Sequence, residues 1–289
     1  MEGIAMSVGA RKKRRRTVLE YTLKYGLIGI LLLVLLFPYA FMVLKSLMSI
    51  VDVNAAVVRF FPSELHFENY KIFIDYIGYF LNSLIVVAIN GVFVPLSACL
   101  VAYPLARHKF TGKKLIFGVI LGTCMIPASV IQIPLYTLFV QMGLYDTLAS
   151  QYIGAFFGGT GMQIFLIIQF IRAIPKEFDQ AAMIDGANRF QIFARILLPL
   201  CVNVCLFLGI SMVIAKWNDF QGPLIYLSTD SKFTVAAAFY WHFSSVGDAS
   251  LLTHQKMAMA VCMTAFPALL FFCFQDQMIG GVKIGGLKG

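Results

Sequence analysis

Long apolar runs separated by short polar segments divide the chain. Each run approaches the ~20 residues that a helix needs to cross the hydrocarbon layer of a membrane. The runs cover about residues 26–44, 79–105, 115–140, 148–171, 200–217 and 257–274. This pattern predicts an all-α polytopic membrane protein with six transmembrane helices, forming a single transmembrane domain over 1–289.

The segment 175–199 is the only long stretch between two runs that is neither a plain connector nor a span. Pro175 fits the first turn of a helix, and Glu177 and Asp179 suit the positive end of the helix dipole. Gly186 supplies the left-handed residue that ends such a helix. We therefore expect a short helix followed by a tight turn.

A second helix is predicted directly after this turn. Asn188, with Gln191 three residues later, has the spacing of a capping box. The second helix is expected to run through Phe190, Phe193 and Ile196. Four apolar residues give the first helix an apolar side: Phe178, Ala181, Ala182 and Ile184. The segment 175–199, called the elbow below, is thus predicted to be an amphipathic helix–turn–helix attached to the membrane at both ends.

The basic residues predict which side of the membrane each segment occupies. One side holds the block Arg11–Arg16 and Lys24, Arg107, Lys109, Lys113, Lys114, Arg172, Lys176, Arg189, Arg195, Lys283 and Lys288. The other side holds Lys45, Arg59, Lys71 and Lys232, with Lys216 and Lys256 at span ends. Because cytoplasmic loops carry an excess of Lys and Arg, both termini and the elbow are predicted to be cytoplasmic.

This orientation assigns the remaining segments. We expect a basic cytoplasmic N-terminus over 1–24, a cytoplasmic loop over 172–199, external loops over 51–78 and 219–255, and a cytoplasmic tail over 280–289. A signal peptide is the competing interpretation of the first run. That run is longer than a typical signal-peptide core, however, and no small-x-small cleavage site follows it cleanly.

Composition excludes several classes of protein. The 289 residues are 60% hydrophobic and 13% charged, whereas soluble domains are near one quarter charged. The net charge of +9 does not indicate a nucleic-acid partner, because the basic residues lie in short loops between apolar runs. Neither G-x-x-x-x-G-K-[ST] nor H-E-x-x-H occurs, and the six cysteines show no C-x-x-C spacing. We expect no catalytic residue, metal site or cofactor in this chain.

The elbow carries a family resemblance. E-F-D-Q-A-A-M-I-D-G-A, followed by I-L-L-P, resembles the EAA loop of ATP-binding-cassette importer permeases. The resemblance implies that the elbow is a coupling helix pair seated in a cleft of an ATPase subunit. Gln180 stands where the family has its usual glutamate, so one charged contact is missing unless Asp179 replaces it. The implied coupling residues are Glu177, Asp179, Gln180, Ala181, Ala182, Asp185, Gly186, Ala187 and Arg189.

Two further stretches narrow the resemblance. K-W-N-D-F-Q-G-P-L-I-Y-L resembles the W-N-x-F-x-x-P-L segment of maltose-type permeases, and M-I-G-G-V-K-I-G-G-L-K-G resembles their glycine-rich tail. The chain therefore resembles the smaller six-span permease of a bacterial carbohydrate importer in the cytoplasmic (inner) membrane. The implied partners are a second, homologous permease subunit forming a heterodimer, two copies of an ATP-binding subunit that use ATP and Mg, an extracytoplasmic solute-binding protein, a saccharide and the lipid bilayer.

The resemblance also gives roles to the external loop and the tail. The loop over 219–255 would touch the solute-binding protein, with Ser244, Ser245, Gly247 and Asp248 forming its tip; an ordinary loop turn explains these residues equally well. The tail would slide between ATPase subunits, and a disordered chain end is the alternative.

A translocation pathway needs polar groups that face a cavity, since polar atoms facing lipid are costly. The candidates are Gln132, Asn203, Asn90, Gln163, Lys216 and Lys256, followed by Asn82 and Gln169. For each amide, hydrogen bonding between helices is the competing interpretation. Pro127 and Pro134 favour a bent helix beside Gln132. Lys216 and Lys256 suggest an acidic saccharide, or else they reach toward outer lipid headgroups.

Two other classes of function remain to be compared. An ion-coupled secondary transporter would need carboxylates within the spans and inverted repeats, and the sequence shows neither. A membrane scaffold without transport activity would explain the spans but gives no reason for the elbow.

Glycine pairs Gly118/Gly122 and Gly154/Gly158 have the spacing that lets helices approach closely.

Overall fold

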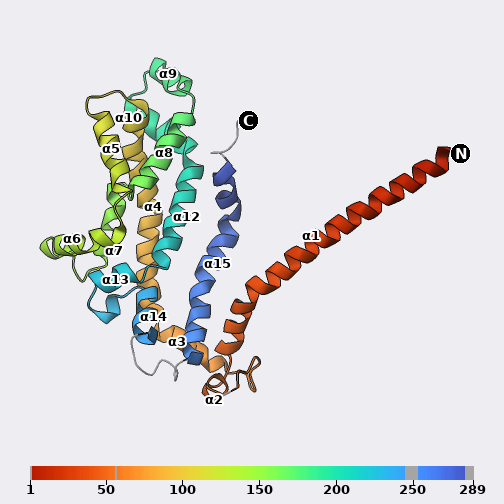
Figure 1. The fold of residues 1–289 in the computed structure, drawn as a ribbon. Coiled ribbons are helices and arrows are strands. Elements are labelled where there is room, and N and C mark those ends of the chain that lie inside the picture. Colours follow the sequence, from red (N-terminus) through yellow and green to blue (C-terminus); the bar gives the residue numbers. More distant parts are fainter. Residues whose placement is uncertain (1, 56, 245–252, 284–289) are drawn as a thin grey trace. The chain divides into compact units, whose positions relative to one another are not determined.

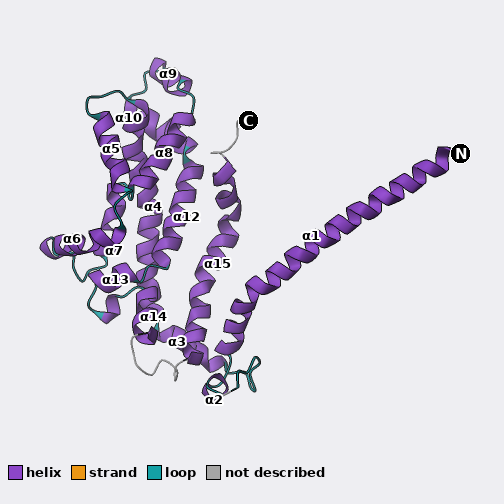
Figure 2. Cartoon of the chain, in the orientation of Figure 1, coloured by secondary structure: helices purple, strands orange, loops and turns teal. Residues whose placement is uncertain are grey.

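The computed structural model describes residues 2–55, 57–244 and 253–283, with side chains over 20–55, 57–243 and 253–277. Helices and turns account for this part of the chain, and no β-strand occurs in it (Figure 2). The chain divides into two compact units. The terminal unit comprises Met1–Ile72 with Ser250–Cys262, and the main unit comprises Phe73–Ala249 with Met263–Gly289.

The terminal unit is built on a long helix whose part Glu20–Ser46 is long and apolar enough to cross a membrane. No residue in the apolar window of that part is buried, so the helix presents its side chains outward. Asn69 donates hydrogen bonds of 2.9 Å to the carbonyl oxygens of Ser46 and Met48. These bonds tie the turn that contains Asn69, Phe67–Lys71, to the end of this helix. The elements are α1 (Glu2–Ser46), α2 (Ile50–Val53), η1 (Phe67–Lys71) and the first part of α15 (Thr253–Lys283).

The main unit is organised around one long helix, α4, which packs chiefly against α12 and α8 (Figure 1). Its buried aliphatic residues form a core between these helices and the elbow. The elements are α3 (Ile72–Asp75), α4 (Ile77–Arg107), α5 (Lys113–Thr123), α6 (Ala128–Gln141), α7 (Ala149–Tyr152), η2 (Ile153–Phe157), α8 (Gly161–Ala173), α9 (Glu177–Ile184), α10 (Arg189–Ile192), η3 (Phe193–Leu197), α11 (Leu198–Leu200), α12 (Val202–Trp217), α13 (Gln221–Tyr226), η4 (Asp230–Lys232), α14 (Val235–Ser244) and the rest of α15.

The predicted runs correspond to four helical segments, one of them interrupted at 158–160, and two bent pairs. The four segments that are long and apolar enough to cross a membrane are Glu20–Ser46, Ile77–Arg107, Ala149–Ala173 and Thr253–Gln277. The pairs are α5 with α6, bent by 103°, and Arg189–Leu200 with α12, bent by 71°. The all-α fold is confirmed, and six spans result when each bent pair counts as one.

Prolines explain where the two bent pairs break. Pro127 precedes α6 with ψ at 136°, an extended backbone that α5 cannot continue through. The expected bend beside Gln132 is therefore confirmed, but 115–140 is not one continuous helix. In the second pair Pro199 removes a backbone donor next to the π-helical turn η3, and a new helix starts after Cys201.

One close approach of two helices in the main unit falls at a glycine pair that the sequence analysis did not single out. A methyl group on Gly209 of α12 would lie 2.6 Å from the carbonyl oxygen of Gly91 on α4. By contrast, nothing lies within 4 Å of a methyl group built on Gly118, Gly122 or Gly154. The predicted packing role of those three glycines is therefore wrong, because their helices face open space at these positions.

This contact gives a stability prediction. Gly209→Ala forces α12 away from α4, and overpacking of this kind costs about 1–3 kcal/mol. The variant should unfold at a lower temperature in detergent, whereas Gly118→Ala should unfold at the wild-type temperature or above it. Thermal unfolding followed by circular dichroism checks the pair. Equal melting temperatures for the two variants would contradict the assigned contact.

Candidate functional site

The elbow forms one end of the main unit, where α9 and α10 lie (Figure 1). Gly186 follows α9 with φ at 80°, which confirms the predicted left-handed turn. Asn188 accepts a hydrogen bond of 2.9 Å from the Gln191 amide, and Gln191 accepts one of 2.8 Å from the Asn188 amide. The capping box is therefore confirmed. The second helix extends as predicted through Phe190, Phe193 and Ile196, because α10, the π-helical turn η3 and α11 form one helical segment, Arg189–Leu200.

The apolar side of α9 does not pack into the core as an amphipathic helix would. Only Ala182 is buried, while the side chain of Ile184 is 86% exposed and Phe178 and Met183 are also exposed. Phe190, at the start of α10, is 70% exposed. A patch of large apolar side chains at the tip of a charged segment is typical of a surface that another protein covers. We call Phe178, Met183, Ile184 and Phe190 the elbow tip.

The other predicted coupling residues divide between this surface and the interior. Gln180, Ala181, Asp185 and Gly186 are exposed, as are Glu177 and Arg189, whereas Ala187 is half-buried. Asp179 differs from its exposed neighbours, because its carboxylate lies 3.0 Å from the guanidinium of Arg107 at the end of α4. The side chains of Arg107 and Asp179 are only 3% and 14% exposed. Asp179 is thus engaged within the chain.

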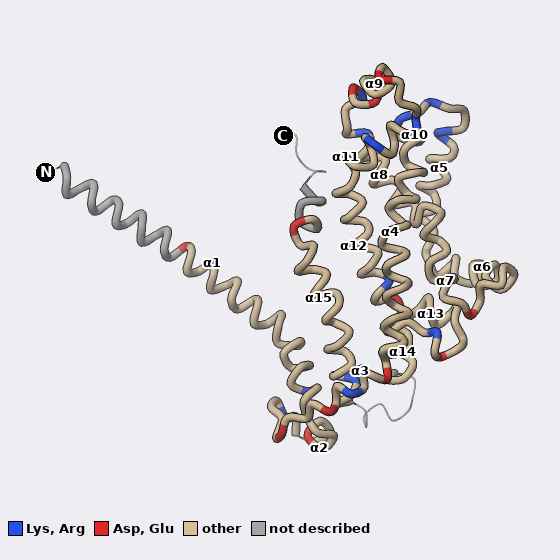
Figure 3. Tube along the Cα trace, turned by 180° about the vertical axis from the view of Figure 1, so that it is seen from behind, with Lys and Arg blue, Asp and Glu red and all other residues tan. Residues whose placement is uncertain are grey.

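Lys and Arg residues gather at the same end of the main unit (Figure 3). They belong to the end of α4, the start of α5, the end of α8 and the elbow: Arg107, Lys109, Lys113, Lys114, Arg172, Lys176, Arg189 and Arg195. Burial, followed by the charge of Arg189, lowers the pKa of His108 beside them. His108 is therefore neutral near pH 7 and adds no charge to this group.

A polar cavity of about 690 Å³ lies within the main unit. It is formed by α4, α6, α7, η2, the start of α8, α12 and α13. Four of the predicted pathway residues line it together: Asn90, Gln132, Gln163 and Lys216. Polar side chains that the sequence analysis did not select also line it: Ser150, Gln151, Thr160, Asp219, Gln221 and Tyr226.

The remaining predicted pathway residues are not in the lining of this cavity. Asn203 is exposed on α12, and Gln169 is exposed on α8. Asn82 donates to the carbonyl oxygens of Ser231 and Phe233, so it holds the turn around η4. Lys256 belongs to the terminal unit and is half-buried there. The expected entrance formed by Lys216 and Lys256 involves residues of both units and stays a prediction.

The amides in the cavity differ in how firmly they are held. Asn90 donates to the carbonyl oxygens of Val86 at 2.8 Å and Gln151 at 3.2 Å. Gln163 accepts a bond of 2.7 Å from the Thr160 amide and thereby caps α8. The side-chain bond from Gln221 to Gln132 is longer, at 3.4 Å, and so is easier to exchange for a bond to a solute.

Two opposite charges face each other in the cavity. The Lys216 ammonium lies 3.4 Å from the Asp219 carboxylate, whose other oxygen accepts a bond of 3.0 Å from the Gly222 amide. Lys216 was selected from the sequence as a lone cation at a span end, but the structure places a balancing anion beside it. Asp219 and Gln221 were missed because both fall in the predicted external loop, and α13 folds this part of the loop back onto the cavity.

An ion pair fixes the part of that loop beyond α13. Asp146 accepts hydrogen bonds from the backbone amides of Ser228 and Thr229 and lies 2.8 Å from the Lys232 ammonium. These donors, Lys232 first and then Thr229, hold the pKa of Asp146 well below its usual range. The carboxylate is therefore charged at any physiological pH, and it ties the loop to the segment between α6 and α7. Of the proposed loop tip, Ser244 ends α14, whereas Ser245, Gly247 and Asp248 lie outside the described residues.

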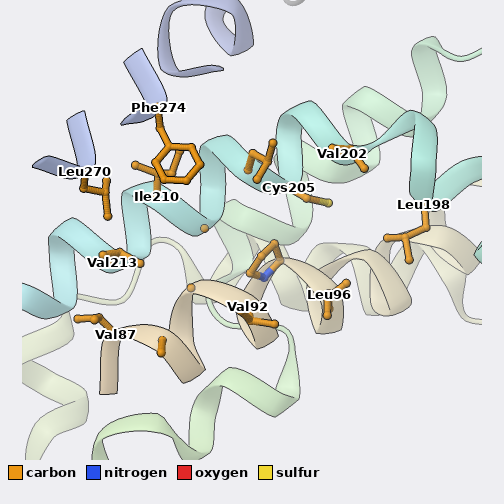
Figure 4. Close-up of a pocket in the computed structure, with 15 residues that line it drawn as sticks. Val87, Val92, Leu96, Leu198, Val202, Cys205, Ile210, Val213, Leu270 and Phe274 are labelled. Carbon is orange, nitrogen blue, oxygen red and sulfur yellow. The ribbon is translucent and has the colours of Figure 1, made fainter. Parts of the chain in front are cut away.

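A second hollow in the main unit is apolar. A groove of about 480 Å³ runs between α4, α12 and α15, and its lining carries no charged or amide side chain (Figure 4). The labelled lining residues are Val87, Val92, Leu96, Leu198, Val202, Cys205, Ile210, Val213, Leu270 and Phe274. A polar solute would find no hydrogen-bond partner on these side chains, so the polar cavity is the candidate solute site.

These features define a polytopic helical membrane protein with a polar cavity in its main unit and an elbow whose tip exposes large apolar side chains. The family model described as binding-protein-dependent transport system inner membrane component matches residues 95–283. The chain belongs to this family. It is accordingly a permease, the non-enzymatic membrane subunit of a transport system that works with a binding protein and with ATPase partner subunits.

Individual relatives agree with this assignment along the full chain. The arabinooligosaccharides transport system permease protein AraQ of Halalkalibacterium halodurans is 28% identical over 96% of this chain and 100% of its own length. The inner membrane ABC transporter permease protein YcjP of Escherichia coli is 27% identical over 95% and 99%. The diacetylchitobiose uptake system permease protein NgcG of Streptomyces coelicolor is 30% identical over 78% and 76%.

A solved structure shares the fold. A chain of a bacterial ABC transporter involved in the import of the acidic polysaccharide alginate aligns with a TM-score of 0.75 at 20% identity. The alignment covers 88% of this chain and 94% of that chain. The helical arrangement described above is therefore that of an ABC importer permease.

Proposed function

We propose that this chain takes up a saccharide across a bacterial inner membrane, as one permease of a heterodimer that two ATP-binding subunits drive. The observation that carries the proposal is the cavity, whose amides and hydroxyls suit a ligand rich in hydroxyl groups. Relatives named for arabinooligosaccharides and diacetylchitobiose support the same class of solute. An extracytoplasmic binding protein would deliver the saccharide.

The elbow is proposed to meet the ATP-binding subunits. Its tip is exposed and apolar, and Lys and Arg residues lie in the segments at its base (Figure 3). An excess of Lys and Arg is typical of the cytoplasmic side of a membrane protein, which supports a cytoplasmic elbow. ATP binding would close the dimer of ATP-binding subunits, and the elbow would pass this movement to the spans, so that the cavity opens alternately to the two sides.

Co-purification tests this assignment. A tagged chain extracted from its own membranes in mild detergent should bring down two copies of an ATP-binding subunit and one related permease. Native mass spectrometry gives the stoichiometry. Recovery of the chain alone, or with a partner that does not hydrolyse nucleotide, would overturn the proposal and would favour the ion-coupled or scaffold alternatives.

The charges in the cavity favour an uncharged saccharide over an acidic one. Asp219 offsets the positive charge of Lys216, so the described cavity presents no net cation to a carboxylate group. Removing one member of the pair would leave an unbalanced charge, whereas removing both keeps the cavity neutral. The pair can therefore be tested by comparing single and double variants.

The double variant Lys216→Gln/Asp219→Asn should import a neutral oligosaccharide at about the wild-type rate, within roughly threefold, since no charge is left unpaired. Lys216→Gln alone should be slower than the double variant. Uptake of radiolabelled neutral and uronate-containing oligosaccharides into proteoliposomes, with the binding protein supplied, makes the measurement. Import of a uronate that drops tenfold or more in the double variant would establish the acidic alternative.

A further inference from the structure

The last turn of α4 holds the elbow at three points. The Arg107 guanidinium lies 3.0 Å from Asp179 on α9 and donates a bond of 2.9 Å to the carbonyl oxygen of Ile174, just before α9. One turn earlier, the Tyr103 hydroxyl donates a bond of 3.2 Å to the carbonyl oxygen of Arg189, at the start of α10. Both halves of the elbow are therefore tied to the same helix end.

The contact between Arg107 and Asp179 joins two opposite charges at 3.0 Å without a hydrogen bond, because Arg107 Nε has no hydrogen-bond partner among the described residues. Both side chains are nearly buried, so neither exchanges its partner freely for water. The planar guanidinium contacts Asp179 through Nε while Nη2 donates a hydrogen bond to the carbonyl oxygen of Ile174. A lysine ammonium does not make these two contacts with the same geometry. A movement of α9 consequently displaces the end of α4 along with it.

The same helix reaches the solute cavity. Asn90 and Val94, earlier in α4, line the cavity, and Gly91 packs directly on α12. Asn90 and Arg107 are about 25 Å apart along the helix, at a rise of 1.5 Å per residue. α4 is continuous over this distance, although Pro95 and Pro104 interrupt its backbone hydrogen bonds. A continuous helix can pass a displacement at one end to the other.

We infer that Arg107 and Asp179 are positioning residues that transmit the movement of the elbow through α4 to the cavity. This inference rests on the proposed function. It replaces the expectation that Asp179 stands in for the missing glutamate in a contact with the ATP-binding subunit, because Asp179 is turned to Arg107 while its neighbour Gln180 is exposed.

The test measures transport and ATP hydrolysis separately in the same assembled complex. Proteoliposomes containing the full transporter receive binding protein, saccharide and ATP, and the saccharide imported per ATP hydrolysed is recorded. Asp179→Asn and Arg107→Gln should lower this ratio by about tenfold or more, within the usual range of coupling between sites. The ATP-binding subunits should still co-purify with both variants, since the elbow tip is unchanged.

Two further variants separate coupling from folding. Asp179→Glu keeps the charge and should restore a large part of the wild-type ratio of saccharide imported to ATP hydrolysed. The exchange Arg107→Asp/Asp179→Arg should give a higher ratio than Arg107→Asp alone or Asp179→Arg alone. Asp75→Asn serves as the matched control, since Asp75 is exposed on α3, away from the elbow and the cavity lining. This control should keep the wild-type ratio.

The outcomes distinguish the inference from the proposed function. A wild-type ratio in Asp179→Asn would overturn the inference alone. Loss of the ATP-binding subunits from Asp179→Asn would also overturn it, since Asp179 would then belong to the docking surface. A wild-type complex whose ATP hydrolysis does not respond to the loaded binding protein would overturn the proposed function itself.

Discussion

Ile184→Asp should separate this chain from its ATP-binding subunits. The side chain of Ile184 is the most exposed of the elbow tip, and a carboxylate there would be desolvated against an apolar partner surface. Residues at the centre of an interface commonly contribute 2 kcal/mol or more, so we expect binding to weaken by about 30-fold or more. Co-purification of the ATP-binding subunits with the tagged variant gives the measurement.

Val57→Asp is the matched control for this change. The side chain of Val57 is 80% exposed, in the predicted external loop of the terminal unit, and the substitution alters charge and size in the same way. It should leave the ATP-binding subunits attached. Equal loss in the two variants would indicate a general effect on folding, and undiminished binding of Ile184→Asp would place the docking surface elsewhere. Gln180→Glu, which restores the usual glutamate of the family, should preserve binding.

Replacing the two loosely held amides in the cavity should reduce uptake strongly. Gln132→Leu/Gln221→Leu removes two neighbouring hydrogen-bonding groups from the cavity while roughly preserving its volume. Hydrogen bonds contribute about 0.5–1.5 kcal/mol each, so losing two or more to the saccharide predicts import slower by about 10- to 100-fold. Uptake by proteoliposomes at several saccharide concentrations should show the loss as weaker apparent affinity.

The control for the cavity is Gln169→Leu. Gln169 is an exposed amide on α8 outside the cavity lining, so the same chemical change at this position should leave uptake unaffected. Assembly with the partner subunits should be normal in both variants. Normal uptake by the double cavity variant would show that the saccharide passes through a different part of the heterodimer.

The elbow was predictable from local signals because its helices begin and end through contacts between near neighbours. Gly186 adopts the left-handed backbone and Asn188 caps α10 through Gln191, as their spacing predicted. What faces the solvent was not predictable. A helix with one apolar side has the same periodicity whether this side packs on its own core or on a partner, and the exposure of Ile184 shows only that it does not pack on the core of its own chain.

The cavity and the contact inside the elbow depend on residues far apart in the sequence. Arg107 and Asp179 belong to different helices. In the sequence, Arg107 resembles an ordinary charge at the end of a span, and Asp179 resembles an ordinary charge in the first turn of a helix. Asp219 reaches the cavity only because α13 folds back from the expected external loop, so hydropathy placed it outside. Asn203 failed to reach the cavity because α12 turns this amide outward.

A photo-crosslinking amino acid at position 184 tests the central claim most directly. In intact cells, irradiation of a chain carrying benzoyl-phenylalanine in place of Ile184 should give a covalent adduct with the ATP-binding subunit, identified by mass spectrometry. The same group in place of Val57 should give no such adduct. The central claim would be contradicted if position 184 formed an adduct with the extracytoplasmic binding protein. It would also be contradicted if position 57, and not position 184, formed the adduct with the ATP-binding subunit.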